Sequence, residues 1–153
     1  MPTDQTIDCP FCRIVAGTAP AHLVYADEHV LGFLDIAPVR PGHTLLIPRA
    51  HVGALAELPP ETGGHLFQAG QRVAAAMRSS ELAADGVNLA LNDGAAAFQT
   101  VFHTHLHVVP RRHGDKARLV TGFLTRRAGD LAGTAEVLRG ELGTVGPSEA
   151  PPW

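Results

Sequence analysis

Three histidines occupy alternate positions in the run His103-Thr104-His105-Leu106-His107. About three-quarters of an unperturbed imidazole is neutral at pH 7, so each ring offers a lone pair that can attack phosphorus, move protons or bind a metal. Because side chains alternate across a strand, a strand over residues 101–109 would place the three imidazoles on one face, lining a surface or cleft. The opposite set would face the core: Phe102, Thr104, Leu106 and Val108.

A polar loop stands directly before this run. Asn92, Gln99 and Thr100 supply side-chain donors, and backbone amides near Gly94 add others. Phosphate oxygens need donors of this kind at short range. Most such segments are only turns. Beside three histidines in register, however, the loop favours a phosphate site over a solvated histidine-rich strand.

Cys9 and Cys12 are the only cysteines, and their spacing is typical of a metal-binding or redox pair. Cys9-Pro10-Phe11-Cys12 resembles a glutaredoxin-type motif, which would need a preceding strand and an amphipathic helix beginning at the second cysteine. Here a polar N-terminus precedes the pair, and Gly17 ends the predicted helix early. A tetrahedral zinc site would need two further nitrogen or sulfur ligands. Two ordinary buried thiols are the remaining alternative.

Apolar periodicity and turn residues predict the elements that must position these groups. The predicted strands cover residues 22–26, 30–36, 44–47, 87–91 and 101–109. Helices are predicted to begin at Pro10 and Pro60 and to cover residues 131–142. The long helix from Pro60 would end near residue 80. Helices interleaved with antiparallel strands, without an internal repeat, predict a single α+β domain.

Composition narrows the classes of partner. The chain has 153 residues, 45% of them hydrophobic, which suffices for one core without disulfides. A formal net charge of -3 offers no basic surface for a nucleic-acid backbone. No apolar run has the length of a membrane span, and no signal peptide is apparent. We therefore expect a cytoplasmic protein that binds neither nucleic acid nor membranes.

The chain resembles the histidine triad (HIT) superfamily, whose signature is His-x-His-x-His followed by two apolar residues, here 103–109. Segments 33–36, 41–48 and 92–94 look like other family segments in the same order. The resemblance implies a HIT-like fold, an antiparallel sheet with one long and one short helix, and a homodimer.

By this resemblance the HIT domain covers residues 9–115. Residues 1–8 are then an N-terminal extension and residues 116–153 a C-terminal segment, of which we expect the last ten to be mobile.

The resemblance also implies roles for the site residues. His105 is the nucleophile that attacks the α-phosphorus, and water resolves the resulting nucleotidyl-histidine. His107 hydrogen-bonds the phosphate, and His43 is a further active-site histidine. Asp35 holds the ribose hydroxyls, although by itself it is equally typical of a turn. The remaining implied nucleotide contacts are an apolar base slot of Phe11, Ile14, Phe33 and Ile36, and phosphate contacts from Asn92, Gln99 and Thr100.

Some bacterial members of this family hold zinc between two cysteines and two histidines. The resemblance thus adds His51 and His103 to Cys9 and Cys12 as ligands. Four protein ligands leave no open coordination position, so such a Zn²⁺ site would be structural. It would tie the N-terminal helix to the sheet.

The predicted activity is hydrolysis of a bond to the α-phosphate of a purine nucleotide. Adenosine phosphoramidates are the leading substrate class, and dinucleoside polyphosphates are the second. A non-catalytic nucleotide-binding or scaffold protein is the alternative, and the intact His105 favours the enzyme. One departure concerns Phe98, which stands where family members often have glycine. Its larger side chain puts the backbone conformation of the loop and the phosphate-side contact at this position in question.

Overall fold

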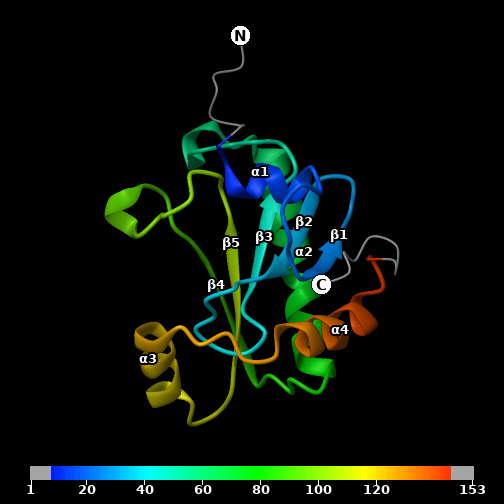
Figure 1. The fold of residues 1–153 in the computed structure, drawn as a ribbon, viewed down its shortest axis with the longest axis vertical. Helices are drawn as coiled ribbons and strands as arrows, with labels where there is room; N and C mark the ends of the chain where they lie inside the picture. Colours follow the sequence, from blue (N-terminus) through cyan, green and yellow to red (C-terminus); the bar gives the residue numbers. More distant parts are fainter. Residues whose placement is uncertain (1–7, 146–153) are drawn as a thin grey trace.

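The computed structural model describes residues 8–145 of the chain. Five strands form one antiparallel sheet in the order β1-β2-β3-β5-β4. Their bounds are β1 Leu23–Ala26, β2 Val30–Leu34, β3 Thr44–Pro48, β4 Gly86–Leu91 and β5 Leu106–Arg111. The helices are α1 Pro10–Val15, α2 Pro60–Ser79, α3 Lys116–Thr125 and α4 Leu131–Leu142, with short 3-10 turns η2 Leu55–Glu57 and η3 Ala95–Ala97. The predicted α+β class is confirmed, with α1 and α2 as the short and the long helix (Figure 1).

Each face of the sheet carries its own hydrophobic cluster. On one face, α2 and α4 pack against the strands, and the predicted stripe of Leu66, Ala69, Val73 and Met77 is buried. On the other face, α1 covers a cluster that includes Phe11. Strands β2 and β3 are buried on both sides because their side chains alternate between the two clusters. The central strands are therefore held rigidly, and they position the loops at their ends.

Two strand boundaries differ from the prediction at residues of the candidate site. β5 begins at Leu106, so of the three histidines only His107 lies in the strand. The preceding segment leaves the sheet, and the Thr104 amide donates to the carbonyl of Val52 at 2.6 Å. Phe102, which we expected in the core, is 56% exposed. Periodicity continues the strand to residue 101, but residues 101–103 bend, and the ladder of interstrand hydrogen bonds begins only at Leu106.

The turn after β2 is the second such difference. Because β2 ends at Leu34, Asp35 and Ile36 belong to the connection to β3 rather than to a strand. Helix α3, which the sequence did not predict, rests on this connection. A side chain at position 122 would collide with the carbonyl oxygen of Val39, so the helix backbone itself makes the contact. No α3 residue is buried, although Leu119, Val120, Phe123 and Leu124 recur at the three- and four-residue steps of an apolar helix stripe.

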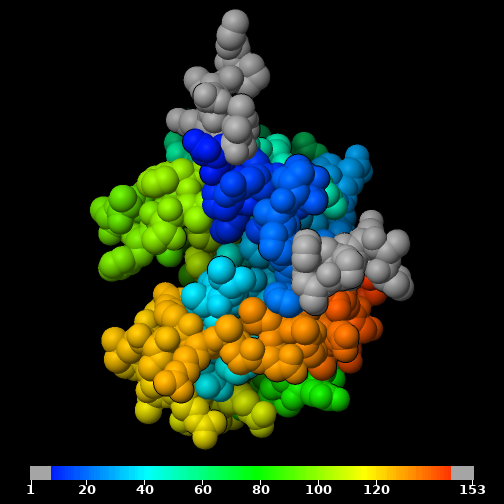
Figure 2. Space-filling view, in the orientation of Figure 1, coloured from blue at the N-terminus to red at the C-terminus, as the bar shows by residue number. Residues whose placement is uncertain are grey.

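Figure 2 shows the surface hollowed between α3 and the loop that carries η3. The prediction of ten mobile C-terminal residues falls mostly on residues 146–153, which lie outside the described residues, as do residues 1–7 of the predicted extension. Within the described part, the Thr144 hydroxyl accepts the Ala26 amide at 3.2 Å. Among residues 8–145, no helix has both the length and the apolar character that a bilayer crossing requires.

We expect Phe98→Gly to raise the free energy of unfolding by about 0.5–1 kcal/mol. Phe98 ends η3 in the left-handed region at φ 67°, and its side chain is 84% exposed. A residue with a Cβ atom is strained there, and glycine is not. Urea unfolding measures the change. Phe98→Ala keeps the Cβ atom and is the control; an equal gain in both variants would assign the effect to removal of the exposed ring instead.

Candidate functional site

The connection between β2 and β3 brings Asp35 and His43 together. One Asp35 oxygen, Oδ1, accepts the Ala37 amide at 2.8 Å and shapes the turn, while Oδ2 lies 3.6 Å from Nε2 of His43. The Val39 amide donates to Nδ1 of His43 at 3.2 Å. A nitrogen that accepts a hydrogen bond carries no hydrogen, so neutral His43 has its hydrogen on Nε2. The backbone of the turn therefore selects the tautomer of His43.

This tautomer determines that of His107. Nε2 of His43 lies 2.9 Å from Nδ1 of His107 and donates to it. Neutral His107 must then carry its own hydrogen on Nε2. That atom is buried and has no hydrogen-bond partner among the described residues. A buried donor without a partner is costly, and a ligand oxygen would satisfy this N–H.

His105 has the opposite arrangement. Its Nδ1 lies 2.7 Å from the backbone carbonyl oxygen of His103 and donates to it, which leaves the Nε2 lone pair free. The ring is held edge-on by Phe11 at a centroid distance of 5.3 Å, and its centroid is 4.9 Å from that of His107. One imidazole therefore presents a lone pair and its neighbour presents an N–H.

Burial keeps these imidazoles neutral. It lowers the pKa of His43 and of His107 to about 4, and the charges of neighbouring histidines act in the same direction. Burial also lowers the pKa of His105, against the opposing influence of its bond to the His103 carbonyl. At pH 7 the three rings are therefore uncharged, as a nucleophile and its hydrogen-bonding partners require.

We expect stability to fall as the pH drops below about 6.5. Below that pH the unfolded chain protonates His43 and His107, whereas the folded protein resists protonation down to about pH 4. The contribution is therefore complete above pH 6.5 and is lost progressively toward pH 4. We expect a loss of about 3 kcal/mol for each histidine, as an order of magnitude. Urea unfolding of the wild type and His107→Gln between pH 7.5 and 5 tests this, because the variant should show a shallower dependence. Equal slopes would contradict it.

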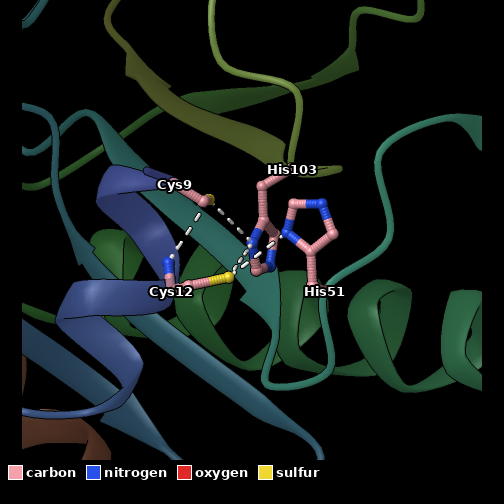
Figure 3. Close-up of side chains that lie close together, drawn as sticks. All are labelled: Cys9, Cys12, His51 and His103. Carbon is pink, nitrogen blue, oxygen red and sulfur yellow. Dashed lines mark hydrogen bonds between the residues drawn. The ribbon is translucent and has the colours of Figure 1, made fainter. Parts of the chain in front are cut away.

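A second cluster joins α1 to the segment before β5 (Figure 3). Nδ1 of His103 lies 3.5 Å from Sγ of Cys9 and 3.6 Å from Sγ of Cys12, and Nδ1 of His51 lies 3.2 Å from Sγ of Cys12. All four ligand atoms lie within 4.8 Å of one another. Zinc bonds of about 2.3 Å to sulfur and 2.1 Å to nitrogen give tetrahedral edges of about 3.6 Å, so the residues fit a zinc ion.

The environment of this cluster supports zinc binding over redox chemistry. Nε2 of His103 donates to the Pro48 carbonyl at 2.8 Å, which directs the Nδ1 lone pair toward the sulfurs. Both cysteines are free, and burial raises the pKa of the Cys12 thiol to about 11. A redox-active cysteine needs a lowered pKa, whereas a bound divalent cation would itself hold the thiolate. No strand precedes the pair within the described residues.

Only three of the four residues predicted to form the base slot lie close together. Phe11 and Phe33 are buried edge to face at 5.3 Å in the cluster beneath α1, and Ile14 packs against this cluster. Ile36 lies elsewhere, in the turn beside Asp35, and is 73% exposed. Of the four apolar residues, Ile36 is therefore the most exposed, Ile14 is half-buried, and the two phenylalanines are buried.

The three predicted phosphate contacts in the polar loop, Asn92, Gln99 and Thr100, differ in burial and in position. Gln99 is buried; its amide donates to the carbonyls of Gly53 and Val101, and its oxygen accepts the Gly94 amide. Both of its donor hydrogens are therefore engaged in shaping the loop.

The other two predicted contacts lie at opposite ends of this loop. Thr100 is exposed and lines a cavity of about 900 Å³ shared with Cys9 and His51. The β4–β5 ladder ends at the pair Leu91 and Leu106. Asn92 directly follows Leu91 and His105 directly precedes Leu106, so both lie at this end of the ladder.

Sequence reasoning missed several groups that orient the site. They are the Val39 amide and the carbonyls of Pro48 and His103, which are backbone atoms that residue types cannot reveal. It also missed Arg126 at the end of α3, which donates to the Ala37 carbonyl at 3.1 Å and whose charge lowers the pKa of both His43 and His107. Nothing in the residues around Arg126 signals this position.

Comparison with known proteins agrees with this geometry. A family model described as HIT domain matches residues 16–114. An uncharacterized HIT-like protein of Mycobacterium tuberculosis is 48% identical over 134 residues, which cover 88% of this chain and 92% of that protein. Adenylylsulfatase HINT3 of Arabidopsis thaliana is 38% identical over 108 residues, which cover 71% of this chain and 54% of that protein.

A similar solved structure contains zinc. The crystal structure of a Zn-bound histidine triad family protein from Mycobacterium smegmatis is 51% identical and matches with a TM-score of 0.82, covering 90% of this chain and 95% of that one. Together with the fit of the cluster of Cys9, Cys12, His51 and His103, it confirms zinc as the predicted cofactor. The assignment of these four residues as its ligands stays a prediction.

Proposed function

Because this chain belongs to the HIT domain family, whose members bind nucleotides and are generally nucleotide hydrolases or transferases, we propose that it hydrolyses a bond to the α-phosphate of a purine nucleotide. One observation carries the proposal. Nε2 of His105 presents a lone pair, and Nε2 of His107, on the neighbouring ring, presents an unpaired N–H. A nucleophile and a donor side by side suit attack on a phosphoryl group.

In the first step, Nε2 of His105 forms a bond to the α-phosphorus while the bond to the leaving group breaks. The N–H of His107 hydrogen-bonds a phosphoryl oxygen, and the 2.9 Å bond from Nε2 of His43 holds His107 in that tautomer. The leaving group takes a proton from solvent as it departs. In the second step, water attacks the nucleotidyl-histidine, the bond between phosphorus and Nε2 of His105 breaks, and the attacking water gives one proton to solvent, which releases the nucleoside monophosphate.

The binding roles follow the placement of the side chains. Asp35 has Oδ1 engaged in its turn, and Oδ2 remains for the ribose hydroxyls. Exposed Ile36 beside it would contact the base. Asn92, at the His105 end of β4 and β5, would contact the phosphate. The phosphate contacts of Gln99 and Thr100 stay predictions, and in this conformation Gln99 would first have to release a carbonyl.

Adenosine phosphoramidates are the leading substrate class, and dinucleoside polyphosphates are the alternative. Both place a leaving group on the same α-phosphorus, so one mechanism serves both. The relative named adenylylsulfatase favours adding adenylyl sulfate to the substrates tested. The homodimer and the cytoplasmic location also stay predictions. Light scattering on a size-exclusion column tests the homodimer.

The test is to incubate the full chain with an adenylated amine, a dinucleoside polyphosphate and adenylyl sulfate. We expect release of AMP, and a quenched reaction should contain protein carrying one adenylyl group, mapped to His105 by peptide mass spectrometry. AMP binding without release of AMP from any of the three would instead identify a non-catalytic nucleotide-binding protein. An adduct at another residue would contradict the role of His105.

A further inference from the structure

A cavity of about 230 Å³ lies between the turn after β2 and helix α3. Three arginines line it: Arg40 from the turn, Arg118 from α3, and Arg127 just beyond the end of α3. None of its lining residues is an aspartate or a glutamate. In Figure 2 the cyan turn lies directly against the gold and orange segment that contains α3. The cavity is therefore a concave site whose charged side chains are all cationic.

The positive charge of this cavity is poorly neutralised. The Nε atom of Arg40 is buried and has no hydrogen-bond partner in the described part of the chain, although Oδ2 of Asp115 lies 3.6 Å away. The carboxylate of Asp115 is already engaged by Arg111 and by the Arg112 amide, at 2.7–3.2 Å. Within residues 8–145, neither Arg118 nor Arg127 forms an ion pair. An anion in the cavity would supply the partner that Arg118 and Arg127 lack.

The cavity also lies next to the catalytic histidines without containing them. Val39 lines it, and the Val39 amide holds Nδ1 of His43 at 3.2 Å. Arg126, between the end of α3 and Arg127, donates to the Ala37 carbonyl in the same turn and adds a further positive charge. An anion bound here would therefore lie beside Val39. The amide of that residue selects the tautomer of His43 and, through His43, that of His107.

We propose that this cavity is a second anion site, which binds a tetrahedral oxyanion of the phosphate or sulfate type. Guanidinium groups present several N–H donors in a planar fork that suits such oxygens. At about 30 Å³ per water in the liquid, the cavity has room for a five-atom oxyanion with a few waters. The oxyanion is either a free inorganic ion or the distal group of a nucleotide conjugate.

The test is a titration of the full chain with inorganic phosphate and with sulfate, against chloride at matched ionic strength, followed by calorimetry or amide NMR shifts. We expect saturable binding with shifts around residues 38–41 and 118–127. Arg118→Gln combined with Arg127→Gln should weaken phosphate binding at least tenfold, and both positions are exposed, so the variant should fold. Arg13→Gln, an exposed arginine on α1, is the matched control and should change the affinity less than twofold.

Two outcomes would overturn the proposal: no saturable phosphate binding to the wild type, or equal affinity in the wild type and the double variant. Competition identifies the source of the anion. If ADP displaces phosphate and AMP does not, the site takes the distal group of a nucleotide. If neither displaces it, the site takes a free ion; either result supports an anion site.

Failure of this proposal is distinguishable from failure of the proposed hydrolase. His105→Asn should leave phosphate binding in the cavity unchanged whether or not the chain hydrolyses nucleotides. A wild type that releases AMP and binds no phosphate would overturn the anion site alone.

Discussion

Replacing His105 by asparagine is expected to lower kcat on the order of 10⁴-fold or more and to leave AMP bound with similar affinity. Removing a nucleophile removes the whole covalent route, and the residual rate then comes from binding and electrostatic stabilisation alone. Asparagine can still donate to the His103 carbonyl, the bond that Nδ1 of His105 makes at 2.7 Å, so the fold around it should persist. AMP release measures the effect, and calorimetry with AMP checks that the site remains formed.

The matched control is His113→Asn, an exposed histidine outside the site, which should retain full activity. His107→Gln should fall between the two, because it removes the N–H donor but leaves the nucleophile. If His105→Asn retained activity within tenfold of the wild type, attack would have to come from water or from another residue, and the covalent mechanism would be wrong.

The second large effect concerns zinc. Stripping zinc from the wild type, or introducing Cys12→Ser, is expected to lower the free energy of unfolding by about 3–5 kcal/mol, because the ligands join segments distant in sequence. Cys12 belongs to α1, His51 follows β3, and His103 precedes β5. At about 2–4 °C per kcal/mol for a chain of this size, Tm should fall by about 10 °C. Thermal unfolding with and without chelator measures the change.

The zinc cluster should also affect catalysis. The carbonyl that orients His105 belongs to His103, whose ring is a predicted zinc ligand, so loosening the cluster should lower kcat as well as Tm. Added zinc should restore both in the stripped wild type but not in Cys12→Ser. If protein purified without chelator contained no stoichiometric zinc, or if chelation left Tm unchanged, the cysteines would be two ordinary buried thiols.

Much of the site could be predicted from residue types and their order. The alternating histidines, the polar loop before them and the Cys-x-x-Cys pair indicated phosphate and metal chemistry without coordinates, because these groups are scarce and their spacing is characteristic. The resemblance to the HIT superfamily added the nucleotide and the two histidine ligands of zinc. The stripe of Leu66, Ala69, Val73 and Met77 likewise predicted the face by which α2 packs on the sheet. Periodicity was misleading where the chain bends away from the sheet, as at Phe102, which is exposed.

What each histidine does depended on the tertiary structure. The residues alone left His103, His105 and His107 as similar imidazoles, distinguished only by resemblance. Folding places the Val39 amide on His43 and the Pro48 carbonyl on His103, and these contacts select the nitrogen that carries each hydrogen. Nearly every residue has the same backbone donor and acceptor, so the sequence does not show which of them will contact a given imidazole. The sequence identifies which imidazoles are present. Only the fold brings up the backbone atoms that make each imidazole a donor, a nucleophile or a ligand.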